Sequence, residues 1–384
     1  MPEDRASTRR HRRAACLLAA ALALFGLPLA HGAAAPAPAP GHGDHDWARG
    51  AVVYGVFVRS FAVDLKGLIA KLDYLNDGDR RTASDLGIDA LWLRHESAGP
   101  EPAAHAADAA DADLDRLVSE AHRRGIKVLV EPAPKETEGM AAAWRARGVD
   151  GFVPGGDDLP LRLDAPLAEA IVQGVKSGRA AGIAAQLRET ERQKPAGAID
   201  APFLTRLDTT RLATRLGGDL ASQKSAAAVL LTLPGAPVIT YGDELGLGDG
   251  PGGGRAPMPW DGIAGVASVA TQATDPSSLL STYRFLIRAR HNSAALRKGD
   301  LELLSPPAGE TAVLAYLRVH DKERVLAVHN LGAAAIDAGP FAVSGAPDPL
   351  FASPGTPPPH VTTGAAASFT VHLPPHGSGV WRLR

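Results

Sequence analysis

The sequence predicts an α/β fold, in which parallel strands alternate with helices, followed by a smaller antiparallel β-sandwich. Two observations lead to this prediction. Over residues 47–298, short runs of β-branched and apolar residues alternate with segments whose apolar residues recur at helical spacing. Over residues 299–384, short apolar runs are instead separated by Gly, Pro and Asp turns. Repeated strand–helix units without a glycine-rich nucleotide-binding fingerprint are typical of a TIM-like barrel.

The expected elements follow this alternation in order along the chain. Barrel strands are predicted at residues 52–58, 88–93, 126–130, 149–153, 161–163, 203–207 and 238–241. Helices are predicted at residues 65–75, 114–122, 167–175, 182–191, 226–233 and 278–295. Sandwich strands are predicted at residues 311–318, 324–330, 368–373 and 379–383.

The N-terminus has the features of an export signal. Basic residues between positions 9 and 13 precede an apolar run at 14–30 and small residues at 33–35, so residues 1–35 are predicted to be a cleaved signal peptide. The alternative is a membrane anchor, which the shortness of the run and Pro28 disfavour. Residues 36–46 form an Ala/Pro linker. We therefore expect a periplasmic or extracellular protein, with no membrane attachment after cleavage.

The overall charge gives no sign of a nucleic-acid partner. The formal net charge is −2, so no strongly basic surface is implied. The single cysteine, Cys16, lies in the predicted signal peptide and would be removed with it.

Several segments resemble, in order, the motifs of glycoside hydrolase family 13, the family of α-amylases and α-glucosidases. They read AVVYGVFVRSFA, GIDALWL, EAHRRGIKVLVE, GVDGF, GAIDAPFLTRLD, LLTLPGAPVITYGDELGL and RAPMPWD. The resemblance covers residues 47–384 and implies a (β/α) barrel followed by a small β-sandwich domain.

Two regions are too short for the complete family fold. A βα unit needs about 30 residues, and the span from Gly151 to Phe203 is one unit short. We interpret residues 158–178 as resembling the family's sixth strand and its helix, so the fifth strand is predicted to be missing. Residues 131–149 are too few for the separate lobe that the family inserts after its third strand. The predicted barrel is therefore incomplete.

The family's reactive side chains are largely replaced. Retaining cleavage of a glycosidic bond needs two carboxyl groups about 5 Å apart. By the resemblance, Gly155 occupies the nucleophile position and Val153 that of an orienting arginine. Lys135 and Glu136 replace an Asn and a His after the third strand, and no segment matches the general acid that follows the fifth strand.

A few positions keep a family match. Asp208 matches the third carboxylate, although it could instead cap the next helix, and Arg206, two residues before it, is a candidate for substrate binding. Tyr54 and Glu131 are further candidates for substrate binding, and Trp92 is expected to pack in the core. No cofactor is implied and no metal site is predicted, because Lys135 stands where the family has a usual calcium ligand.

Three hypotheses follow. The first is a secreted protein that has lost hydrolysis and binds an α-glucan or maltooligosaccharide. The second is an active glycosidase with relocated carboxylates among Glu131, Asp164 and Asp208; the alternative for Asp164 is a cap of the helix that follows it. The third is a truncated product that folds poorly, because an opened barrel exposes strand edges.

Overall fold

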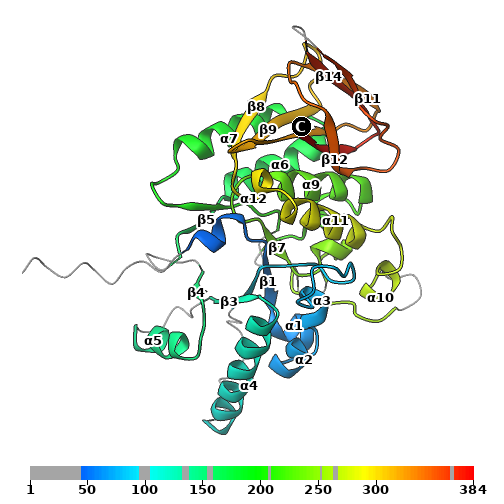
Figure 1. The fold of residues 1–384 in the computed structure, drawn as a ribbon. Coiled ribbons are helices and arrows are strands. Elements are labelled where there is room, and N and C mark those ends of the chain that lie inside the picture. Colours follow the sequence, from blue (N-terminus) through cyan, green and yellow to red (C-terminus); the bar gives the residue numbers. More distant parts are fainter. Residues whose placement is uncertain are drawn as a thin grey trace, which may run out of the picture. The chain divides into compact units, whose positions relative to one another are not determined.

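The computed structural model describes residues 45–94, 104–131, 138–153, 159–205, 209–250, 253–262, 267–363 and 367–384. The chain from His42 to Arg384 clusters as one compact unit, traced in Figure 1. The predicted signal peptide and most of the predicted linker lie outside the described residues. No helix in these ranges has both the length and the apolar character needed to cross a membrane.

The first part of the chain forms a parallel sheet that curves into a partial barrel. Runs rich in Val, Ile and Leu form its strands, which pack well in a sheet buried on both faces. These strands are β1 (Val53–Phe57), β2 (Ala90–Arg94), β3 (Lys127–Val130), β4 (Gly151–Phe152), β5 (Leu161–Leu163), β6 (Ile199–Ala201) and β7 (Val238–Thr240). The strand order is β4-β3-β2-β1-β7, and β5 and β6 pair separately. A parallel bridge from Phe203 to Val238 links the β6 segment to β7.

The barrel is open between β4 and β5. No ladder joins these two strands in the described chain, and only residues 153–160 connect them. A crossover between neighbouring parallel strands needs a dozen or more residues and usually contains a helix. The incomplete barrel predicted from the sequence is thus confirmed.

Helices cover the outer face of the barrel, and several of them begin at a capping residue. Asp64, Asp164, Asp219, Ser278 and Ser293 each accept a hydrogen bond from a backbone N–H in the first turn of the helix that follows. The helical segments are η1 (Asp46–Gly50), α1 (Val58–Ala62), α2 (Leu65–Ile69), α3 (Leu72–Leu75), α4 (Ala104–Arg123), α5 (Glu138–Ala146), α6 (Ala165–Ser177), α7 (Ala181–Arg192), α8 (Leu212–Arg215), α9 (Leu220–Thr232), η2 (Asp243–Leu245), α10 (Val269–Gln272), α11 (Leu279–His291) and α12 (Ala294–Lys298).

Three predicted elements differ from the structure. The helix predicted at 278–295 is two helices, because Ser293 accepts from the Leu296 N–H and starts α12. The helix predicted at 65–75 is likewise divided into α2 and α3. The strand predicted at 203–207 lies earlier, at β6, since Pro202 has no N–H to continue the ladder and Phe203 makes only an isolated bridge.

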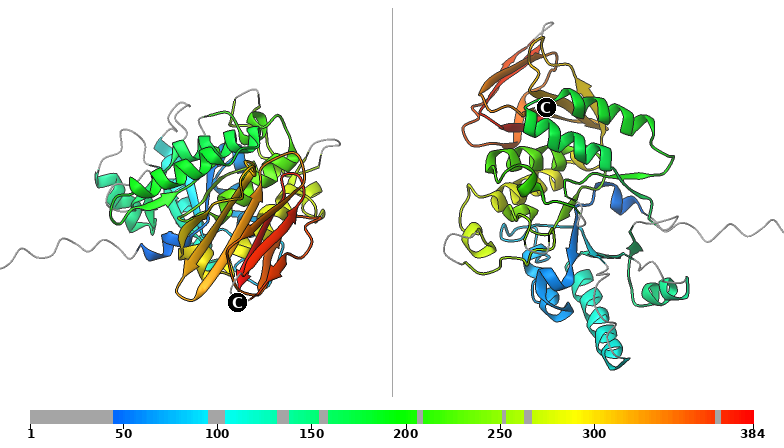
Figure 2. Two further views of the ribbon diagram at one scale, coloured as in Figure 1. Left: turned by 90° about the horizontal axis from the view of Figure 1, so that it is seen from above. Right: turned by 180° about the vertical axis from the view of Figure 1, so that it is seen from behind.

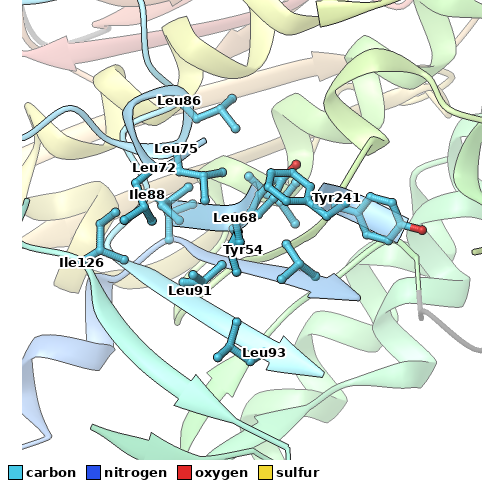
Figure 3. Close-up of a cluster of buried hydrophobic side chains, with 14 of the residues drawn as sticks. Tyr54, Leu68, Leu72, Leu75, Leu86, Ile88, Leu91, Leu93, Ile126 and Tyr241 are labelled. Carbon is cyan, nitrogen blue, oxygen red and sulfur yellow. The ribbon is translucent and has the colours of Figure 1, made fainter. Parts of the chain in front are cut away.

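The two faces of the sheet bury different side chains. Val53, Ala90, Trp92, Leu129 and Val238 share the cluster that fills the barrel interior. Alternate residues of the same strands point to the opposite face and pack against the helices. Figure 3 shows part of this outer cluster, where Tyr54, Leu91 and Leu93 meet leucines from α2 and α3.

The C-terminal part is an antiparallel β-sandwich, as predicted. One sheet has the order β12-β15-β10-β9-β8 and the other β11-β14-β13. Phe341, Phe369 and Trp381 lie in the core between them. The strands are β8 (Asp300–Leu304), β9 (Val313–His320), β10 (Glu323–Asn330), β11 (Ile336–Phe341), β12 (Pro347–Ala352), β13 (His360–Thr362), β14 (Ser368–Leu373) and β15 (Ser378–Leu383).

The sandwich shares a hydrophobic core with the helices that precede it. Ile183 of α7, Leu230 of α9 and Leu296 of α12 belong to the same buried cluster as Tyr316 of β9 and Val325 of β10. Figure 2 shows α6 and α7 (green) beside the strands of the sandwich. The strands of the sandwich therefore pack directly on the helical layer of the barrel.

Candidate functional site

The carboxyl ends of the barrel strands are where a parallel barrel places its ligand-binding residues. Arg94 is the last residue of β2, Glu131 follows β3, Val153 follows β4 and Tyr241 follows β7. Parallel pairing of β1 with β2, and of β2 with β3, brings Phe57, Arg94 and Glu131 to the same edge. We take this edge as the candidate site.

An ion pair between Arg94 and Glu131 occupies this edge. Arg94 Nε donates to Glu131 Oε2 at 2.7 Å, and Nη2 donates to Oε1 at 3.3 Å. The Arg94 and Glu131 side chains are only 16% and 22% exposed. The guanidinium also lies 4.7 Å from the ring centroid of Trp92 and 5.7 Å from that of Phe57. Both carboxylate oxygens of Glu131 are thus engaged by a cation that stacks on two rings.

The segment RAPMPWD, of which the structure describes every residue, brings a second arginine to Phe57. The Arg255 guanidinium lies 4.4 Å from the centroid of the Phe57 ring. The segment is anchored on the residues after β1, because Ser60 Oγ donates to the Arg255 carbonyl at 3.1 Å and Trp260 Nε1 donates to the Phe61 carbonyl at 2.7 Å. The sequence did not identify Arg94 or Arg255 as site residues. For Arg94 the available signal was a polar residue directly after a predicted strand.

Tyr54 lies on the other face of the sheet. Its side chain is fully buried among the leucines of the outer cluster (Figure 3). Its hydroxyl donates to Glu244 Oε1 at 2.7 Å, and the Tyr74 hydroxyl donates to the same oxygen at 2.7 Å. In this position neither face of the Tyr54 ring is open to a sugar, because strand alternation turns the side chain away from the barrel interior.

Asp243 and Glu244, which follow β7, are also buried rather than presented to a ligand. Desolvation raises the pKa of Asp243 to about 7, although the nearby Arg211, with Nη1 3.6 Å from Asp243 Oδ1, opposes this shift. Desolvation likewise raises the pKa of Glu244, against the two tyrosine hydrogen bonds that lower it. These carboxyl groups belong to a polar cluster in the core.

Asp164 caps a helix, as one of the two sequence-based alternatives predicted. Its Oδ1 accepts from the Leu167 N–H at 2.9 Å, and its Oδ2 accepts from the Thr190 hydroxyl. The residue is 6% exposed. Both carboxylate oxygens are therefore used to hold the start of α6 and the end of α7. Trp92 is confirmed as a core residue, since it is 3% exposed within the barrel interior.

The remaining predicted positions lie outside the described residues. They are Lys135, Glu136, Gly155, Arg206 and Asp208. Within the ranges that the structure does describe, no group of three or more His, Cys, Asp or Glu side chains is arranged to hold a metal ion.

Comparison with known proteins finds relatives over most of the chain. No family model matches. The chain is 34% identical over 207 residues to a trehalose synthase of Thermus thermophilus, a match that covers 45% of this chain and 21% of that protein. It is 24% identical over 447 residues to alpha-amylase 3 of Dictyoglomus thermophilum, which covers 76% of this chain and 86% of that protein. The first match thus spans about a fifth of its relative and the second most of it.

Solved structures share the fold. The crystal structure of an alpha-amylase from H. orenii matches with a TM-score of 0.74 and 24% identity, covering 88% of this chain and 100% of that one. At this identity the likeness establishes a common architecture, a barrel followed by a β-sandwich.

Proposed function

We propose that this chain, which belongs to glycoside hydrolase family 13, the α-amylase family, is a secreted protein that binds α-glucans and does not cleave them. The proposal has three parts, which are the loss of hydrolysis, the retention of a glucan site and export from the cell. Each part is supported by a different observation.

The short connection between β4 and β5 carries the first part. In the family, the nucleophile follows the fourth strand and the general acid follows the fifth. Here residues 153–160 lead directly to β5, which resembles the family's sixth strand, so the segment that would bear the acid has no place in the chain. The residue at the nucleophile position is Gly155, which has no side chain to attack a sugar.

The carboxylates that could replace these two groups already have other partners. Glu131 accepts two hydrogen bonds from Arg94, and Asp164 caps α6. A general acid must donate a proton to the leaving oxygen, and a nucleophile must present a free oxygen to the anomeric carbon. Neither residue is available for these roles without breaking the contacts that hold it. These contacts favour a non-hydrolytic protein over an active glycosidase with relocated carboxylates.

The match to alpha-amylase 3 covers most of that relative's length, and the name of this relative supports an α-glucan as the ligand. Asp208 keeps the family pattern, and Asp208 and Arg206 are the proposed contacts to sugar hydroxyl groups. Arg94 and Glu131 lie at the carboxyl ends of β2 and β3, where they form an ion pair. The signal-like sequence at residues 1–35 supports export.

Affinity electrophoresis in gels that contain soluble starch tests glucan binding. The wild-type protein is expected to migrate more slowly as the starch concentration rises, and Asp208→Ala to lose most of this retardation. Asp321→Ala is the matched control, because the Asp321 side chain is 88% exposed on the sandwich. Equal mobility of the wild type in gels with and without starch would refute the glucan site.

A further inference from the structure

A second cleft lies away from the barrel edge described above, and it has a volume of about 660 Å³. Its walls are the second half of α7, the first residues of β6, the loop entering β7 and the chain from the end of α12 into β8. Phe57, Arg94, Glu131 and Arg255 do not line it. Its volume falls in the usual range for small-molecule sites, about 300–1,000 Å³.

Two buried arginines fix the walls of this cleft. Arg290 donates to the carbonyls of Leu233 and Gly235, at 2.8 and 2.5 Å, in the loop that enters β7. Arg318 donates to the carbonyls of Thr232 and Gly299, at 2.6 and 2.7 Å, and so joins the end of α9, from which this loop leaves, to the start of β8. Both arginine side chains are fully buried. The cleft is therefore a preformed site and does not depend on a mobile surface loop.

The inner surface of the cleft is aliphatic. None of the described residues that line it is aromatic, so the cleft lacks the flat rings on which sugars stack. Its apolar lining includes Leu167, Leu187, Ile199, Leu233, Leu301 and Leu303. Such a surface favours a ligand with an aliphatic body over a bare sugar or a free inorganic ion.

Cationic side chains surround this aliphatic surface. They are Arg49, Arg188, Arg192, Lys194, Arg297 and Lys298. Within the described part of the chain, Arg188 and Arg297 make no ion pair, and Arg297 Nε is buried without a hydrogen-bond partner. Arg192 pairs with Glu189, and Lys298 pairs with Asp46. Partly exposed pairs of this kind contribute little, so both cations can turn to a ligand at small cost.

Acidic residues also line the cleft, but the six cationic lining residues outnumber the four acidic ones. Asp200 is neutralised by Arg162 and Lys194, at 2.6 and 3.2 Å. Asp164 is held by the helix start that it caps. Glu191 and Asp300, at the exposed rim, are the other acidic lining residues.

We propose that this cleft binds an amphipathic anion, a small molecule with one carboxylate or phosphate group on an aliphatic body. The anionic group would lie between Arg188 and Arg297, where charge-assisted hydrogen bonds are available. The aliphatic body would cover the leucines. This site is separate from the proposed glucan site and does not depend on it.

Calorimetric titration with octyl phosphate, kept below its micelle-forming concentration, tests the proposal. One molecule is expected to bind per chain and to raise the melting temperature, because a ligand of the native state stabilises it. The Arg188→Gln/Arg297→Gln variant is expected to bind at least tenfold more weakly, since two charge-assisted hydrogen bonds are lost. Arg81→Gln, in which the side chain removed is 89% exposed outside the cleft, should bind as the wild type does.

Three comparisons separate the parts of the proposal. Octanol carries the body without the charge, and inorganic phosphate carries the charge without the body, so each should bind far more weakly than octyl phosphate. Arg188→Gln alone should leave the fold intact, because Arg188 is exposed on α7. This single variant should also bind octyl phosphate more weakly than the wild type does. Equal affinity of the wild type and the double variant, equal affinity for octanol or inorganic phosphate, or no binding of octyl phosphate would each overturn the proposal.

Discussion

At the scale of single residues, the arginine that faces Glu131 decides what that carboxylate can do. A carboxylate that accepts two hydrogen bonds from one guanidinium is held in a fixed orientation. The guanidinium is itself held between Trp92 and Phe57, which makes its release costly. Both oxygens of Glu131 are therefore held by Arg94, which fits the proposal that Glu131 does not act as a nucleophile.

Asp243 leads to a prediction about pH. Its pKa rises from 3.8 in its ordinary state to about 7 in the folded chain, mainly through desolvation. Between these values the folded state binds more protons than the unfolded state, so stability is highest at the acidic end and falls as pH rises towards about 7. The raised pKa of Glu244 acts in the same direction.

Melting curves from about pH 5 to about pH 7.5 measure this effect. We expect the melting temperature of the wild type to fall across this window, and Asp243→Asn to make the fall shallower, because an amide does not titrate. A wild-type melting temperature that rises with pH, or an identical slope in Asp243→Asn, would show that Asp243 does not titrate as described.

At the scale of elements, α6 depends on Asp164. Replacing Asp164 by Ala removes the acceptor of the Leu167 N–H and the partner of the Thr190 hydroxyl. The expected loss in the free energy of unfolding is about 1–3 kcal/mol, from the lost cap and the stranded hydroxyl. Urea unfolding measures it, with Asp164→Asn as a control that keeps a capping oxygen and should lose less. An Ala variant as stable as the wild type would contradict the cap.

The elements also show what the sequence could and could not predict. Periodicity located α6, α7 and β1, and the sequence offered Asp164 as a possible cap of α6, because these signals are local. The division of the predicted helix at 278–295 was missed, since a serine inside a helical pattern can either cap or point to solvent.

The candidate site was predicted less well than the fold. The chain positions at the strand ends followed from the resemblance, but the contact of Arg94 with Glu131 joins residues 37 positions apart. The orientation of Tyr54 depended on which face of β1 the helices cover. Both facts depend on how elements far apart in the sequence pack against each other. A single sequence specifies this packing only through the complete fold.

At the scale of the whole molecule, α9 and the sandwich are joined by the buried guanidinium group of Arg318. Desolvation lowers the pKa of Arg318 to about 10, and Arg318 compensates for its burial by binding the Thr232 and Gly299 carbonyls. Replacing Arg318 by Met leaves both buried carbonyls without this hydrogen-bond donor. The free energy of unfolding should fall by about 1–3 kcal/mol for each carbonyl. Because the sandwich and the helices share one hydrophobic cluster, the whole protein should still unfold in a single transition.

Calorimetric melting checks this prediction. We expect one sharp transition for the wild type and one, at lower temperature, for Arg318→Met, with Arg382→Met at the partly exposed rim of the sandwich as a milder control. Two separate transitions in the wild type would mean that the sandwich is an independent folding unit. A broad transition would instead support a chain that folds poorly.

Incubation of the purified protein with maltoheptaose, followed by chromatography of the products, tests the central claim most directly. A chain without a nucleophile and a general acid should release no glucose or shorter maltooligosaccharide above the uncatalysed background, and Asp208→Asn should change nothing. Turnover by the wild type that Asp208→Asn abolishes would contradict the claim and establish an active glycosidase.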